Sequence, residues 1–81
     1  MATFLVNTSG PSYLSHANDL DSAVALVLER LPLRRGWTHE VEESLVAGPD
    51  GFHRAAFVRV VSSTSTVVKG HGAVVYALKS V

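Results

Sequence analysis

The 81-residue chain contains no cysteine. Disulfide bonds, thiolate catalysis, cysteine-based zinc fingers and iron–sulfur ligation are therefore excluded. Charged residues are also scarce, at 17%, whereas about 25% is typical of soluble domains. The seven basic residues balance the seven acidic ones. Because nucleic acid and anionic lipid are usually held by a basic excess, this composition disfavours both as partners.

No apolar run is long enough to be a targeting or membrane segment. The first run ends at Asn7, and the longest, residues 23–28, is far shorter than the roughly 18 residues of a transmembrane helix. We therefore expect no membrane association, and a cytoplasmic location because nothing directs export. We also expect a single domain, residues 1–81, since about 100–200 residues is the usual domain size.

Hydrophobic residues recur at helical spacing in one part of the chain and predict an amphipathic helix over residues 19–31. Asp19 (or Asn18) is suited to cap its first turn, and Pro32 prevents its continuation. The apolar stripe consists of Leu20, Ala23, Val24, Val27, Leu28 and Leu31.

After Gly36 the hydrophobic period changes to two, which predicts a strand that ends at Ala47, a turn over 48–51 and a returning strand from Phe52 to Ser62. Further strands are expected at 3–8, 13–16 and 74–81, with a final hairpin around 69–72. The hydroxyl-rich segment 62–66 is compatible with either strand or loop. This order, β(β)αβββ, predicts an α+β two-layer sandwich with one helix on an antiparallel sheet of four to five strands.

A turn at 48–51 would set Ala47 opposite Phe52 and so define two sheet faces. The helix should cover the face that carries Trp37, His39, Val41, Leu45, Phe52, Ala56, Val58 and Val60. The opposite face would pair Glu40 with Arg59 and Glu42 with Phe57. It would also carry Val46, Ala55, Val61, Val67, Val74, Tyr76 and Leu78. A bulge in the Ser/Thr run would reverse the faces of the last four.

One helix of about thirteen residues can cover only one of these two faces. Burial of apolar surface stabilises a protein by about 25 cal/mol per Å². Several solvent-exposed apolar side chains on the other face would therefore lose several kcal/mol of stabilisation, which is comparable with the stability of a small domain. We therefore expect the second face to be closed by another protein or by further copies of this chain, as a homodimer or higher oligomer. The alternative is that loops and long polar side chains cover it.

No residue pattern in the chain is typical of a catalytic or metal site. The histidines lack the spacing of a metal site; they are His16, His39, His53 and His71. The predicted register also places His39 and His53 on opposite faces. We expect His39 to be a partly buried, hydrogen-bonded side chain. The carboxylates of 40, 42 and 43 lack the cleft that acid–base catalysis needs, so an exposed strand edge explains them better. Neither a nucleophile elbow nor a phosphate loop is present. We expect no enzymatic activity, cofactor or metal.

The best basic patch is Arg34-Arg35, next to Gly36-Trp37. With Arg54 and nearby aromatic residues it could hold a phosphate backbone, although the aromatic spacing of RNA-binding sheets is absent. Solvation of the loop, or contact with an acidic partner, explains the patch better than nucleic-acid binding.

No motif assigns the chain to a family. A short strand, a helix start at 17–23 and a β-meander give a layout that resembles small phage-encoded or mobile-element proteins, including anti-CRISPR-like inhibitors of bacterial defence complexes, and also antitoxin-like and dodecin-like domains. We predict a non-enzymatic protein-binding module, either an inhibitor of a larger complex or an assembly factor. The alternatives are a homo-oligomer that encloses a small flat ligand near Trp37 or Tyr76, and a nucleic-acid-binding module. The predicted partner-binding residues are Arg34, Arg35, Glu40, Glu42, Phe57, Arg59 and Tyr76.

Overall fold

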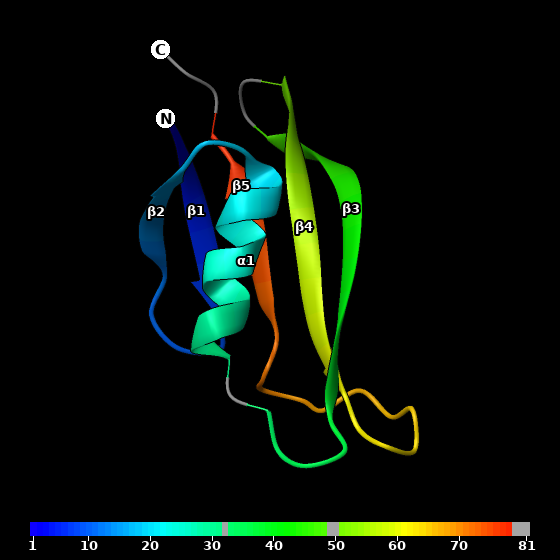
Figure 1. Ribbon diagram of the computed structural model, residues 1–81. Coiled ribbons are helices and arrows are strands. Elements are labelled where there is room, and N and C mark those ends of the chain that lie inside the picture. The colour runs from blue at the N-terminus through cyan, green and yellow to red at the C-terminus, as the bar shows by residue number, and fades with distance from the viewer. Residues whose placement is uncertain (32, 49–50, 79–81) are drawn as a thin grey trace.

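The computed structural model describes residues 1–31, 33–48 and 51–78, and in them one helix packs on a five-stranded antiparallel sheet (Figure 1). The strand order is β2-β1-β5-β4-β3, which confirms the predicted α+β class. The elements are β1 (Ala2–Thr8), β2 (Tyr13–Ala17), α1 (Leu20–Arg30), β3 (Thr38–Gly48), β4 (Gly51–Val61) and β5 (Ala73–Ala77). The expected helix stop at 32, the centre of the turn at 49–50 and the strand end at 79–81 lie outside the described residues.

Helix α1 begins and ends where its sequence signals predict. The backbone of Asp19 is extended, and its Oδ1 accepts a hydrogen bond of 2.8 Å from the backbone N–H of Ser22. Asp21 in the first turn and Arg30 in the last complement the helix dipole. Leu31 returns to extended backbone, so the helix agrees with the predicted 19–31 to within one residue at each end.

The core lies between α1 and the middle of the sheet. The helix buries Leu20, Ala23, Val24 and Val27, four residues of the predicted stripe, while Leu28 and Leu31 are partly buried. They pack against residues of β1, β2, β4 and β5, namely Phe4, Val6, Ala17, Ala56, Val58, Ala73 and Val75. No polar or charged residue is buried in the described part of the chain, so apolar contact is what attaches the helix to the sheet.

The β3–β4 register is the predicted one, with Ala47 opposite Phe52. The helix nevertheless packs over β1, β2, β4 and β5 and stops short of β3. On the helix side Val41, Leu45 and Phe52 are therefore 44%, 65% and 68% exposed, and the prediction that the helix covers this whole face is wrong at β3. The reason is topological: the β1–β2 hairpin joins β5 on the side away from β3, and α1 follows β2 directly.

The chain reverses at 62–66, so the predicted final hairpin at 69–72 is wrong. Ser62 and Thr66 close a tight turn through a 2.9 Å backbone hydrogen bond. Val67 already pairs with Val61, and β5 then continues in the same direction beside β4. Segment 69–72 is thus an excursion within one returning segment, and its glycine-rich sequence suits a bulge as well as a hairpin. The register places Val74 and Tyr76 on the face away from α1, as predicted.

Candidate functional site

The sheet face away from α1, here called the far face, is covered by no element of the described chain (Figure 1). Its central row runs from Leu5 through Tyr76 and Ala55 to Ser44, across β1, β5, β4 and β3. Ala55 is nevertheless fully buried, since the larger side chains beside it close over it. The neighbouring row contains Phe57 between Val74 and Glu42, and the large apolar residues of both rows are only partly buried. The far face is therefore an apolar surface that meets solvent.

Two hollows indent the far face, one on either side of its central row. The first has a volume of about 490 Å³ and is lined by Glu42, Ser44, Phe57, Val58, Arg59, Gly72, Ala73 and Val74. The second has a volume of about 270 Å³ and is lined by Leu5, Asn7, Val46, Ala47, Gly48, His53, Tyr76 and Leu78. Apolar walls with a few polar groups are typical of surfaces that receive protruding side chains.

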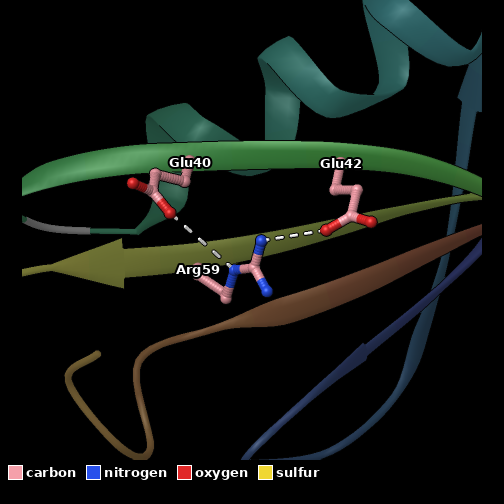
Figure 2. Close-up of polar contacts among 3 residues, drawn as sticks. All are labelled: Glu40, Glu42 and Arg59. Atoms are coloured by element: carbon pink, nitrogen blue, oxygen red, sulfur yellow. Dashed lines mark hydrogen bonds and ion pairs between the residues drawn. The ribbon is translucent and has the colours of Figure 1, made fainter. Parts of the chain in front are cut away.

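An ion-pair cluster of Glu40, Glu42 and Arg59 borders the first hollow (Figure 2). Nη2 of Arg59 donates to Oε2 of Glu42 over 3.0 Å, while its Nε lies 4.0 Å from Oε1 of Glu40. The three side chains are 43–65% exposed, so each pair contributes at most about 1 kcal/mol to stability. The contact with Glu40 confirms the predicted cross-strand pair, whereas the shorter, diagonal contact with Glu42 was not predicted. The main effect of the cluster is to hold one guanidinium between two carboxylates.

The structure separates the predicted partner-binding residues into two groups. Glu40, Glu42, Phe57, Arg59 and Tyr76 share the far face. The remaining two, Arg34 and Arg35, are exposed in the loop between α1 and β3.

Sequence reasoning missed the contribution of β1 to the far face. Leu5 lines the second hollow because β1 pairs with β5, its Leu5 opposite Tyr76. The segment 3–8 was recognisable as a strand, but no local signal in the sequence specifies the strand with which it pairs.

The histidines do not converge on a metal site in the part of the chain that the structure describes. His39 and His53 lie on opposite sheet faces, as predicted. His53 Nδ1 is 3.0 Å from the carbonyl oxygen of Ala77. The Nε2 atom of His39 is buried and meets no hydrogen-bond partner among the described residues, which corrects the expectation of a hydrogen-bonded side chain at that nitrogen.

Comparison with known proteins adds no functional information. No family model matches the chain, and no curated protein or solved structure is significantly similar to it. In the described ranges, α1 is too short to cross a bilayer and no other helix is present.

Proposed function

We propose that this chain is a non-enzymatic protein-binding module of the cytoplasm and that the far face is its contact surface. The observation that supports this function is the set of large apolar side chains on the far face, which no described element covers. With extents of 42 and 22 Å, one side of the molecule offers about 900 Å², close to the ~800 Å² that each partner buries in a standard protein interface.

The composition of the far face also supports protein binding. Tyrosine and arginine are among the residues that dominate binding energy at interfaces, and Tyr76 and Arg59 lie on this face beside Phe57. The ion-pair cluster carries a net charge of −1, so the matching partner surface is apolar with a basic group at one border. By analogy with the small phage-encoded proteins of similar layout, we infer an inhibitor of a larger complex or an assembly factor.

Capture of partners with far-face variants tests this function. The tagged chain is used to retain proteins from a lysate of its native host, and the retained protein is then purified and titrated calorimetrically. We expect Phe57→Ser to weaken binding about tenfold or more, as for a hot-spot aromatic residue. The matched control is Leu45→Ser on the helix side, where Leu45 is 65% exposed, and its affinity should match that of the wild type. Equal affinity for all three proteins, each shown to be folded by circular dichroism, would contradict the proposal.

A second copy of the chain is the other candidate for this surface. The ion-pair cluster contains both charges, so Arg59 of one molecule can face Glu42 of another across a two-fold axis. Light scattering over a dilution series distinguishes the two cases. A mass that stays that of a monomer down to low micromolar concentration favours a foreign partner. A dimer that Phe57→Ser dissociates favours self-association.

A further inference from the structure

A third hollow is lined by the last turn of α1 and by the segments around it. Its volume is about 280 Å³, and it is lined by Thr8, Ser9, Tyr13, Val27, Arg30, Leu31, Gly70, His71 and Gly72. The hydroxyl of Ser9 donates a 2.7 Å hydrogen bond to the carbonyl oxygen of Gly70, which ties the β1–β2 turn to the 69–72 excursion. This end hollow is thus built from segments far apart in the sequence, and it shares only Gly72 with the lining of the first hollow on the far face.

Arg30, Tyr13 and His71 line the end hollow, and Trp37 and Arg34 lie behind His71. The guanidinium carbon of Arg30 lies 5.1 Å from the centre of the Tyr13 ring. The rings of His71 and Trp37 meet in a T-shaped contact with their centres 5.2 Å apart, and the guanidinium carbon of Arg34 lies 5.4 Å from the centre of the Trp37 ring. The stacking holds each guanidinium in place through a cation–π interaction.

The two stacked arginines have donors to spare. The side chains of Arg30 and Arg34 make no ion pair or hydrogen bond with any described residue, whereas those of Arg54 and Arg59 are both paired with glutamates. A guanidinium that stacks on a ring still directs its N–H groups outward in its own plane, where they match two oxygens of a phosphate or carboxylate. No acidic residue is among the described residues that line the end hollow. Its charge therefore favours an anion.

We propose that the end hollow binds a small phosphate monoester that carries a flat ring. The guanidinium of Arg30 and the imidazole of His71 supply donors for the phosphate oxygens, and the ring of Tyr13 supplies an aromatic surface for the flat group. A volume of about 280 Å³ lies just below the ~300–1,000 Å³ of drug-sized ligand sites, which favours a small ligand.

Titration with AMP, followed by two-dimensional NMR, tests this site. The chain has a single tryptophan, so its one indole signal reports unambiguously on Trp37, whose ring contacts the lining residue His71. We expect saturable shifts of that signal and of the amides of Gly70, His71 and Gly72. Adenosine and inorganic phosphate, each of which has half of the recognised chemistry, should bind at least tenfold more weakly than AMP. Arg30→Gln should weaken AMP binding about tenfold or more, because a charge-assisted bidentate contact is lost.

Two controls keep the outcome decisive. Arg54→Gln removes an arginine at the far end of the β3–β4 hairpin and should bind AMP as the wild type does. Arg30→Lys keeps the positive charge and should retain part of the affinity for AMP. It tests the proposal even if Arg30→Gln disturbs the packing on Tyr13. The proposal is overturned if no signal of the end hollow shifts, if adenosine binds as well as AMP, or if Arg30→Gln and Arg54→Gln bind alike. Tighter binding of a single-stranded oligonucleotide without terminal phosphate would overturn it in favour of nucleic-acid recognition.

Discussion

Replacement of Gly72 by alanine should destabilise the protein through one backbone contact. A methyl group at this position would lie 2.7 Å from the carbonyl oxygen of Val58, whereas ordinary contacts begin at 3.4 Å. Val58 belongs to the core and to β4, so β5 would have to move away from β4 by about 0.7 Å at this point. Overpacking of this kind costs about 1–3 kcal/mol, offset by ~0.4–1 kcal/mol because alanine restricts the unfolded chain. We expect a net loss of about 1–2 kcal/mol.

Thermal and urea unfolding, followed by circular dichroism, measure this loss. For a domain of 60–100 residues each kcal/mol lowers Tm by about 4–8 °C, so Gly72→Ala should melt about 4–16 °C below the wild type. Gly10→Ala is the matched control, because its methyl group would lie 3.7 Å from Oγ1 of Thr8, an ordinary contact. Its Tm should equal or slightly exceed that of the wild type. If the two variants melt together, β5 does not approach β4 as closely as described.

Three further perturbations test the core, the far face and the helix cap. Val75 is fully buried, so Val75→Ala should cost about 2–3 kcal/mol in urea unfolding, and a loss below ~1 kcal/mol would contradict its packing. Glu40→Lys combined with Glu42→Lys should weaken partner binding at least tenfold in a titration of the folded variant. The two exposed ion pairs contribute at most about 1 kcal/mol each, so Tm should fall by no more than about 8–16 °C. The backbone N–H of Ser22 lowers the pKa of Asp19 below its ordinary 3.8, so the stability from this cap is complete above that value and is lost as pH falls through the folded pKa. Asp19→Asn should keep the cap without this pH dependence. Thermal melts of both proteins between neutral pH and about pH 3 test this expectation. If the wild type and Asp19→Asn lose stability with acid in the same way, the charge of the cap contributes nothing.

Local signals in the sequence were sufficient for α1 and for the β3–β4 hairpin. The helical spacing from Leu20 to Leu31 and the cap at Asp19 confine the helix, and the turn that opposes Ala47 to Phe52 sets every cross-strand pair of β3 and β4. The pairing of Glu40 with Arg59 follows from that register, because side chains alternate between the two faces of a sheet. The diagonal contact of Arg59 with Glu42 became visible only in the structure.

Long-range placement could not be predicted in the same way. The glycines of 69–72 suit a hairpin and a bulge equally, and only the pairing of Val67 with Val61 excludes the hairpin. The pairing of β1 with β5 depends on the packing of the whole core, since no residue of 2–8 specifies which strand β1 pairs with. For that reason the contribution of Leu5 to the far face, and the end hollow where Tyr13 meets Arg30, became visible only in three dimensions.

The last described strand, β5, occupies the middle of the sheet, and this has a consequence for synthesis on the ribosome. It joins the β1–β2 hairpin to the β3–β4 hairpin, with Ala73 paired to Thr8 on one side and to Val58 on the other. Until residues 73–77 have been translated, each hairpin is a two-stranded ribbon, and such ribbons are at best marginally stable alone. Closure across so long a stretch of chain is also slow. The nascent polypeptide must therefore remain open, and exposed to proteases and chaperones, until residues 73–77 have left the ribosome.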